Sequence, residues 1–476
     1  MPPFDCELKG ILVTLPEILK TIVNMKIFKH SFTTLCAMLA TVAMIFTSCE
    51  NDDEDNQLRV TLPDAPTTAY FDYGQTHSFE VSMKKEHSYE IEEAPEGWKV
   101  ELPSKTLLKV TAPAKGAGTM SGVVKISVHR KERTVSAQLK VEVLPATTIA
   151  QNANCYILSI PNNRYKIKAT VKGNSSQSIG GTPASAAILW QTSKDLLGTV
   201  MLDEDHISIV TTADPNDSNK INEGNAVVVV KDADDNVLWS WHLWLTNYDP
   251  ATENVTYPDG SVMMDRNLGA KSNGSDDAYN AYGMFYQWGR KDPLIMSDAA
   301  TSTSNASTYG PLNTNIAFTT MECDEETGTI DYAIKFPTRI LRGNEESGYD
   351  WLYKSHDASL WSTSKTMYDP CPAGWKVPAT NVWNGIAEFV DGEFEGGWHF
   401  NFGGQTTFYP AAGRRSFSKG VLTNVNHDGT PYTGYYWSAN SAASNKSNSL
   451  YFNIDGIENA QANYRAGGFQ VRCVKE

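Results

Sequence analysis

The feature that most constrains the fold is a strict alternation of apolar and polar residues on both sides of a short polar turn. Apolar residues occupy every second position over Val124–Val128, the polar run Arg130–Arg133 follows, and the alternation resumes over Val135–Val143. A period of two places successive side chains on opposite faces of a strand, so the pattern predicts a hairpin of two half-buried strands. Together with shorter strand-like pieces before it, this hairpin predicts an immunoglobulin-like β-sandwich over residues 60–145.

A second hairpin predicts another sandwich of the same kind over residues 146–250. The apolar run Ala226–Val230 and the tryptophan-rich run Val237–Leu245 flank a polar turn. His242 lies within the second run, between Trp241 and Leu243, and we expect it to be a packed strand residue and not a ligand.

The turn between these runs carries Asp232, Asp234 and Asn236, which have the spacing of a calcium loop. The central glycine and the final glutamate of an EF-hand are missing, however. Aspartate and asparagine are also the residues that tight turns prefer. The sequence therefore favours a plain turn, and we expect neither a metal site nor a cofactor.

The composition agrees with this reading and excludes one class of partner. The 476 residues are enough for several domains, and 34 glycines, 22 prolines and 11% aromatic residues suit strands and turns better than long helices. The formal net charge is -15, and no run of lysine and arginine is long enough to follow a phosphate backbone. A nucleic-acid ligand is therefore not expected.

The N-terminal region predicts attachment to a membrane through lipid. Residues 25–48 combine two lysines with an apolar run that ends just before Cys49. This arrangement is typical of a secretory signal peptide, and Phe-Thr-Ser-Cys resembles the lipobox of bacterial lipoproteins, whose cysteine is acylated and becomes the new N-terminus. The alternative is a short uncleaved anchor with an incidental cysteine. We interpret residues 1–24 as a mis-assigned start, because a complete signal begins at Met25.

Residues 49–59 form an acidic segment that cannot build a core, so we expect a solvated tether. It resembles the acidic export signal of surface lipoproteins in Bacteroidetes-type bacteria. The expected location is the outer membrane, with the protein lipid-anchored and facing outward.

Residues 257–476 carry six motif blocks in a fixed order. The blocks are MMDRNLGA (263–270), YGMFYQWGR (282–290), YDPCPAGWKVPA (368–379), FYPAAGRR (408–415), GYYWSAN (434–440) and GFQVRCVKE (468–476). In this order they resemble the Fibrobacter succinogenes major paralogous domain, a family found in many bacterial surface lipoproteins. One departure follows Pro378, where the family's Thr-x-x-Glu-Trp is replaced by Ala-Thr-Asn-Val-Trp383.

The resemblance implies a fold but no reaction. Some of the blocks are similar to those of formylglycine-generating-enzyme-like and C-type-lectin-like domains, which implies a loop-rich α+β domain; a short helix is expected near residues 381–390. The complete prediction is a multidomain, mainly β chain with two immunoglobulin-like sandwiches followed by this loop-rich α+β C-terminal domain. Fold alone does not settle function.

Cys371 and Cys473 lie in two of the matched blocks, and we expect a disulfide between them, as an exported protein permits. Two free buried thiols are the alternative. Cys155 and Cys323 belong to different modules and are expected to be unpaired.

Aromatic residues beside polar ones are the candidates for ligand binding. Rings of tryptophan and tyrosine can stack on sugars, although in a loop-rich domain they are also often the core itself. The adjacent pair Arg414 and Arg415 is expected at the surface. The candidates are Trp288, Arg290, Trp398, Arg414, Tyr435 and Trp437.

These observations predict an outer-membrane surface lipoprotein that acts in non-enzymatic recognition or adhesion, with a glycan or a surface protein as ligand. No nucleophile elbow, zinc motif or phosphate-binding loop is present in the sequence, and we expect no catalytic residues. An accessory or tip component of a fimbria-like assembly, in contact with fimbrial subunits, is one alternative. A carbohydrate-active or modifying enzyme in the C-terminal domain is another.

Overall fold

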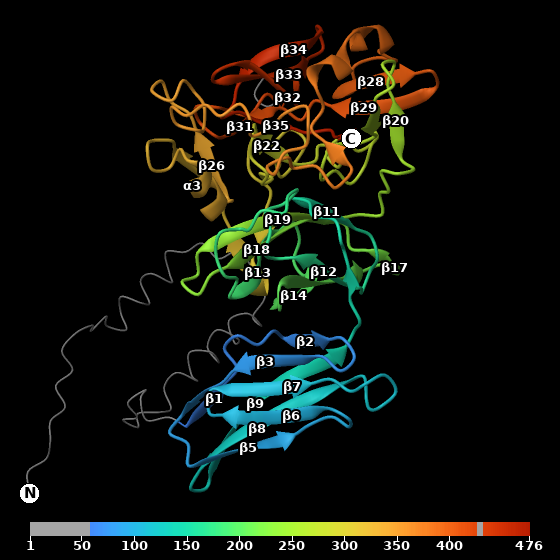
Figure 1. Ribbon diagram of the computed structural model, residues 1–476. Helices are drawn as coiled ribbons and strands as arrows, with labels where there is room; N and C mark the ends of the chain where they lie inside the picture. Colours follow the sequence, from blue (N-terminus) through green and yellow to red (C-terminus); the bar gives the residue numbers. More distant parts are fainter. Residues whose placement is uncertain (1–57, 426–431) are drawn as a thin grey trace, which may run out of the picture. The chain divides into compact units, whose positions relative to one another are not determined.

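A computed structural model describes residues 58–425 and 432–476 of the chain (Figure 1). The protein is multidomain and mainly β, with two sandwich modules and a loop-rich C-terminal domain, as the sequence predicts. None of the helices in the described part of the chain is long and apolar enough to cross a membrane.

The first module is a sandwich of a four-stranded sheet, β2-β9-β8-β5, and a three-stranded sheet, β3-β7-β6. Its core takes Phe71 and Leu139 from the first sheet and Phe79 and Val110 from the second. The strands are β1 (Arg59–Thr61), β2 (Thr68–Phe71), β3 (Thr76–Glu80), β4 (Ser82–Lys84), β5 (Ser88–Glu93), β6 (Lys99–Ser104), β7 (Leu107–Thr111), β8 (Ser121–Arg130) and β9 (Arg133–Val143).

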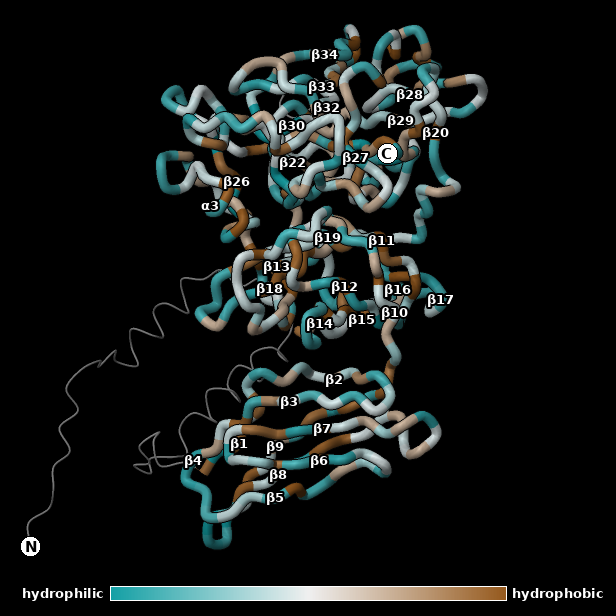
Figure 2. Tube along the Cα trace, in the orientation of Figure 1, coloured by the Kyte–Doolittle hydropathy of each residue, from teal (hydrophilic) through white to brown (hydrophobic). Residues whose placement is uncertain are grey.

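The predicted hairpin of this module is β8 and β9. Arg130 pairs with Arg133, so the turn has two residues, and Lys131 adopts the positive φ of 55° that such a turn needs. Val124, Ile126 and Val128 point into the core, which is the face predicted by their alternation. The apolar residues are brown along these strands in Figure 2.

The second module has one sheet of order β10-β12-β15-β14 and another of order β11-β19-β18-β13-β23-β24. The last two strands belong to the C-terminal part of the sequence, which therefore extends the sheet of this module. Within residues 146–250 the strands are β10 (Thr147–Thr148), β11 (Cys155–Leu158), β12 (Arg164–Lys168), β13 (Ser185–Gln191), β14 (Leu197–Asp203), β15 (His206–Thr211), β16 (Ala213–Asp214), β17 (Asp217–Ile221), β18 (Gly224–Lys231) and β19 (Val237–Leu245).

Strands β18 and β19 are buried on both faces. Val228 and Trp241 pack inside the sandwich, whereas Val227 and Trp244 pack into a core shared with the C-terminal domain. Strands covered on both sides read as continuous apolar runs, which explains the composition of the second hairpin. His242 is buried here, as expected.

The C-terminal domain is built around the sheet β31-β30-β35-β32-β33-β34, with β22 paired to β35. Smaller sheets are β20-β21-β36-β27, β25-β26 and β28-β29. Its strands are β20 (Asn254–Thr256), β21 (Val262–Met264), β22 (Phe285–Gln287), β23 (Thr308–Tyr309), β24 (Asn315–Ile316), β25 (Thr319–Glu322), β26 (Arg339–Arg342), β27 (Trp375–Lys376), β28 (Gly397–Phe402), β29 (Gln405–Pro410), β30 (Arg414–Arg415), β31 (Leu422–Thr423), β32 (Gly434–Ala443), β33 (Lys446–Phe452), β34 (Ile457–Tyr464), β35 (Gly468–Gln470) and β36 (Val474–Lys475).

The helices of this domain are short. The helix expected near residues 381–390 is replaced by two 3-10 helices, η3 (Thr380–Trp383) and η4 (Ile386–Phe389), because Gly385 between them has a positive φ of 70°. The other helices are α3 (Ile330–Lys335) and the 3-10 helix η2 (Pro311–Asn313).

The predicted disulfide between Cys371 and Cys473 is confirmed. Its cysteines are 102 residues apart in the sequence and their Cα atoms are 6.0 Å apart. Cys155 and Cys323 are free and buried, as expected. Cys49 and the signal segment lie outside the described residues.

Candidate functional site

The structure assigns two of the predicted ligand-binding aromatics to the core. Trp288 and Trp437 have no exposed surface. The Trp288 indole donates to the Ser438 carbonyl at 2.8 Å, and the Trp437 indole donates to the Tyr286 carbonyl at 2.9 Å. A ring with no accessible face cannot stack on a sugar, so the prediction that these two bind a ligand is wrong.

Two of the arginines are also buried, contrary to expectation. Arg290 is only 3% exposed, and its Nη1 donates to Gln287 Oε1 and to the Arg339 carbonyl. Arg415 is 1% exposed, and it donates to the carbonyls of Ile295 and Gly420. Neither side chain lies at a surface that a bulky ligand could reach, which corrects the prediction for Arg290 and for the surface pair.

Trp398 keeps part of its ring accessible. It lies half-buried on β28, its indole donates to the Asn453 carbonyl at 3.0 Å, and its ring is 5.1 Å from that of Phe394. Ile454, which follows Asn453 at the tip of the β33–β34 hairpin, is 61% exposed. This place is accessible and apolar at Ile454, and the same hairpin tip carries the polar side chains of Asn453 and Asp455.

The remaining two candidates meet on the large sheet. The guanidinium of Arg414 lies over the ring of Tyr435, with Cζ 5.0 Å from the ring centroid. Tyr435 pairs with Tyr451 across β32 and β33, and their ring centroids are 5.1 Å apart. Tyr451 pairs in turn with Glu458 of β34. We call Arg414, Tyr435, Tyr451 and Glu458 the Arg414 surface.

The layers beneath this surface hold it in place. Tyr435 is 5% exposed and its ring is 4.8 Å from that of Phe469, which stacks on buried Trp437 at 4.0 Å. Tyr435 therefore packs beneath Arg414 and has little contact with solvent. Arg414 and Tyr451 are half-buried, and Glu458 is exposed. A ligand at this place would contact Arg414, Tyr451 and Glu458.

The guanidinium of Arg414 is unusually free of partners. Within residues 58–425 and 432–476 it makes no hydrogen bond or ion pair, and its Nε is buried without an acceptor. A guanidinium can donate five hydrogen bonds, most strongly to carboxylates and other oxygen acceptors. The side chain is thus positioned by the Tyr435 ring, and because Nε is buried, only the two terminal nitrogens can donate to a ligand.

Both phenols stay protonated beside it. Burial raises the pKa of Tyr435, and the charge of Arg414 acts against that rise. Burial and then the Glu458 carboxylate raise the pKa of Tyr451, which Arg414 again opposes. The Arg414 surface therefore offers one cation, a phenol and one carboxylate around an aromatic face, which suits hydroxyl-rich ligands.

Tyr451 and Glu458 are the residues that the sequence reading missed. The segment Ser449–Asn453 was recognisable as a strand, and its alternation puts Leu450 and Phe452 on one face and Tyr451 on the other. Leu450 and Phe452 are fully buried. The alternation could therefore have marked Tyr451 as an outward-facing tyrosine, but nothing local indicates its neighbour Arg414.

A histidine–aspartate contact close to a buried thiol lies elsewhere in the C-terminal domain. His356 Nδ1 is 3.2 Å from Asp350 Oδ2, and Asp350 is buried. The nearby Cys323 thiol donates to the Asp350 carbonyl, and burial raises its pKa. A buried thiol with a raised pKa is a poor nucleophile.

The described residues contain no group of three or more histidine, cysteine, aspartate or glutamate side chains placed to hold a metal ion. At the suspected calcium turn, Asp232 Oδ1 instead accepts from the backbone N–H groups of Asp234 and Asn236. These bonds are those of an aspartate-stabilised turn, as the sequence favours.

No family model and no curated protein matches the chain. Solved structures with some similarity include a chimeric titin Z1Z2 (17% identity, 40% of this chain, 96% of that one, TM-score 0.15) and tandem Ig repeats of Dlar (13% identity, 40% and 97%, TM-score 0.16). Another is an endo-fucoidan hydrolase from glycoside hydrolase family 107 (12% identity, 38% and 33%, TM-score 0.16). At these TM-scores the likenesses carry no argument about function.

Proposed function

We propose that the protein is an outer-membrane surface lipoprotein that recognises a glycan without chemical turnover, through the Arg414 surface. Its lipid attachment would be at Cys49, and its C-terminal domain would be of the Fibrobacter succinogenes major paralogous type. The sequence motifs support the attachment and the family, while the support for recognition comes from the described surface.

One observation carries the glycan proposal. The guanidinium of Arg414 rests on Tyr435, has no hydrogen-bonding partner in the described part of the chain, and lies beside the half-buried Tyr451. Sugar rings combine apolar C–H faces, which pack on phenol rings, with hydroxyl or carboxylate oxygens, which accept from a guanidinium. Glu458 adds an acceptor for sugar hydroxyls.

The test is binding of the purified full-length protein to a panel of neutral and acidic oligosaccharides, followed by calorimetry on the best ligand. We expect Arg414→Gln and Tyr451→Ala each to weaken binding by about 10-fold or more, since a charge-assisted hydrogen bond contributes about 1.5–3 kcal/mol. Neither change should alter the melting temperature greatly, because both side chains are partly exposed.

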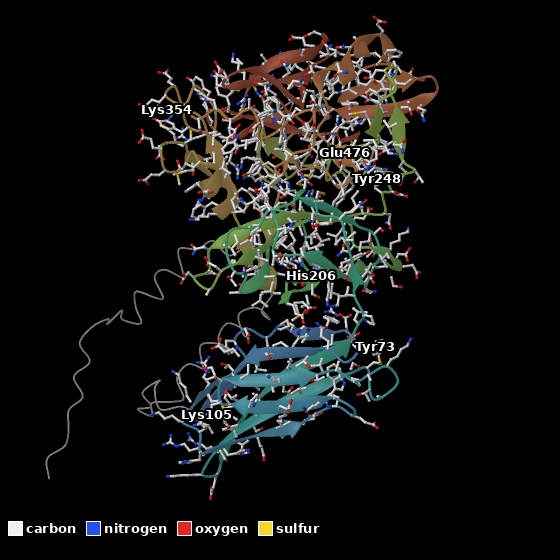
Figure 3. The ribbon with its side chains drawn as sticks, in the orientation of Figure 1. Tyr73, Lys105, His206, Tyr248, Lys354 and Glu476 are labelled. Carbon is white, nitrogen blue, oxygen red and sulfur yellow. A yellow bond between two sulfur atoms is a disulfide. The ribbon has the colours of Figure 1, made fainter. Side chains whose placement is uncertain are left out.

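Two variants serve as controls. Tyr73 is an exposed tyrosine in the turn between β2 and β3 (Figure 3), and Arg342 is a partly exposed arginine that pairs with Glu322. Tyr73→Ala and Arg342→Gln should bind as tightly as the unmodified protein. Ligand binding that survives both Arg414→Gln and Tyr451→Ala would move the site elsewhere, and turnover of any oligosaccharide would favour the enzymatic alternative.

A separate observation favours the assembly alternative. A groove of about 560 Å³ runs past the edges of β13 and β14, lined by side chains that include Ile188 and Val200. In the part of the chain that the structure describes, β14 pairs only with β15, and β13 meets a second strand, β23, only at Gln191. Unpaired strand edges are templates for an added strand.

A leucine at the rim of this groove is exposed to solvent. Leu312 is 92% exposed with φ of 53°, and the next residue, Asn313, is bonded to Asp195 through both its side-chain oxygen and nitrogen. We propose an extended segment of a neighbouring protein subunit as the occupant, since it would pair with the free edge of β13 and cover Leu312.

This second proposal predicts that the protein is found in sheared surface filaments. Leu312→Asp and Ile188→Lys should reduce its amount there several-fold without changing glycan binding. Ile160→Asp, at an exposed isoleucine of the second module away from the groove lining, should have no effect. Filament content that is equal in all three variants, or an absence of the protein from filaments, would reject the strand-addition role.

A further inference from the structure

Arg414 differs from the other arginines of the C-terminal domain. Each of the others donates at least one hydrogen bond to a described residue, whereas Arg414 makes no hydrogen bond and no ion pair in residues 58–425 and 432–476. A half-buried cation is costly without an oxygen acceptor, so the question is which kind of ligand supplies one. The other arginines are Arg266, Arg290, Arg339, Arg342, Arg415, Arg465 and Arg472.

The accessible part of the Arg414 guanidinium is its terminal fork. Nε is buried without an acceptor, whereas Nη1 and Nη2, which also lack partners in the described part of the chain, remain accessible to solvent. A ligand that approaches these two nitrogens end-on meets two parallel N–H groups in one plane. A carboxylate offers two coplanar oxygens to such a fork, and a hydroxyl offers only one.

The one carboxylate of the Arg414 surface does not neutralise the guanidinium. No ion pair joins Glu458 to Arg414 within the described residues, and Glu458 Oε2 accepts from the Gln461 amide at 3.2 Å. Strand β33 separates Glu458 from Tyr435, on which the guanidinium lies, so two strand spacings of about 4.8 Å place the two backbones about 10 Å apart. Salt screens exposed charges beyond about 8 Å at physiological ionic strength. Most of the Arg414 charge is therefore left for a ligand.

The Tyr451 ring lies between these two charges. It is half-buried, its centroid is 5.1 Å from that of the Tyr435 ring, and its hydroxyl makes no hydrogen bond within the described residues. A sugar ring can pack its C–H face on such a phenol. On one side this sugar would meet the Arg414 donors, and on the other side the Glu458 carboxylate, which accepts from hydroxyl groups. A sugar with a carboxylate at one end and hydroxyls at the other is complementary to this arrangement.

We propose that the glycan bound by the Arg414 surface contains an acidic sugar of the uronic acid class, whose carboxylate accepts end-on from Nη1 and Nη2 of Arg414. The sugar ring packs on Tyr451, and a hydroxyl on its far side donates to Glu458. This assignment rests on the proposed function and narrows it from glycans in general to those that carry a carboxylate.

The test compares two ligands that differ only in this charge. A short oligogalacturonate and its methyl ester have the same rings and the same hydroxyls, but the ester has no negative charge. We expect calorimetry with the full-length protein to show that the acid binds about 10-fold more tightly than the ester, because charge-assisted hydrogen bonds are about twice as strong as neutral ones. The preference should shrink when the salt concentration is raised several-fold.

Three variants locate the preference. Arg414→Gln should abolish it, so that acid and ester bind equally weakly, whereas Arg414→Lys, which keeps the charge but has no planar fork, should retain only part of it. Lys446→Gln is the matched control, because Lys446 Nζ also lies over a ring of the same sheet, 4.4 Å from the centroid of Tyr464. This third variant should keep the full preference for the acid.

The possible failures separate this inference from the proposed function. Equal affinity for acid and ester, with both weakened by Tyr451→Ala, would overturn the acidic assignment and leave glycan recognition at this surface intact. A preference for the acid that survives Arg414→Gln would also overturn it, because the carboxylate would then bind elsewhere. If neither ligand nor any other oligosaccharide binds, the proposed function is rejected and this inference with it.

Discussion

His242 shows what the double-sided burial of β19 does to a single titratable residue. Its Nε2 lies 2.9 Å from Asn225 Oδ1 and its Nδ1 lies 3.3 Å from the Tyr286 hydroxyl, so both ring nitrogens are engaged by neutral groups. Burial lowers the pKa of His242 to about 3. No carboxylate of the described residues pairs with this ring, so the imidazole is uncharged in the folded protein throughout the physiological range.

This burial predicts a loss of stability in mild acid. In the unfolded chain the histidine titrates near its usual pKa of about 6.5, so between pH 6.5 and pH 3 the unfolded state binds the extra proton and stability falls as the pH falls. From pH 7.5 to pH 5, the free energy of unfolding should decrease by about 2 kcal/mol more in the unmodified protein than in His242→Gln. Urea unfolding at the two pH values measures this difference.

The exposed His87 gives the matched control. His87→Gln should keep the full acid sensitivity of the unmodified protein. If His242→Gln keeps it too, the imidazole of His242 is already protonated or exposed in the folded state, and the neutral assignment fails.

Residue identity alone separates core from surface poorly among the aromatics. Trp437 of β32 and Tyr451 of β33 are both aromatic strand residues, yet Trp437 has no exposed surface and Tyr451 is half-buried. The difference arises from Phe469 of β35, which stacks on Trp437 from a distant part of the sequence. A neighbour so distant in the sequence does not affect the local pattern of residues. The sequence around Trp437 is therefore equally compatible with a core residue and with a ligand contact.

At the scale of elements, local periodicity was sufficient to predict strands that have one solvent-exposed face. The core-facing residues of the β8–β9 hairpin follow the predicted alternation, although Ser127 on the other face is buried as well, and the turn at Lys131 has two residues as expected. The β18–β19 hairpin was also predictable, because apolar runs flank an aspartate-rich turn. What periodicity did not disclose is that β19 is covered on its second face, since Trp244 packs against residues of the C-terminal domain.

Short elements could not be predicted from the sequence for a related reason. The helix expected near residues 381–390 is broken at Gly385, and β23 and β24, of two residues each, have no recognisable signal of their own. They form because the edge of β13 provides partners at Gln191. The position of the Arg414 surface depends on such pairings, since β30 has only two residues and joins the sheet through β31 and β35.

At the scale of the whole molecule, charges connect the first two modules. Arg164 of β12 is fully buried, and its Nη2 donates to Asp203 at 2.6 Å while its Nη1 lies 3.3 Å from Asp72 in the first module. Lys166 contacts the same two carboxylates at 2.7 and 2.8 Å. This network could not be predicted from the sequence, because its two carboxylates lie 37 to 94 positions away from its two cations and each residue is ordinary in its own context.

Asp72 is the part of this network that the first module contributes, and it also accepts the backbone N–H of Ala146 at 2.8 Å. Ala146 lies in the segment between β9 and β10, so this bond fixes the connection between the modules. Asp72→Ala removes the acceptor together with one counter-charge of Arg164 and Lys166. The Ala146 amide should then exchange with deuterium about 10-fold faster or more, as expected for the loss of a hydrogen bond to a charged group.

Asp64 provides a matched control, because its Oδ1 accepts the Glu80 N–H at 2.8 Å within the first module. Asp64→Ala should accelerate exchange at Glu80 and leave Ala146 unchanged, while Asp72→Ala should do the reverse. Protection at Ala146 that survives Asp72→Ala would show that the carboxylate does not hold the connection. The remaining contacts between the modules include Gln75 with Arg164 and Asp203, and the Thr199 hydroxyl with the Thr68 carbonyl.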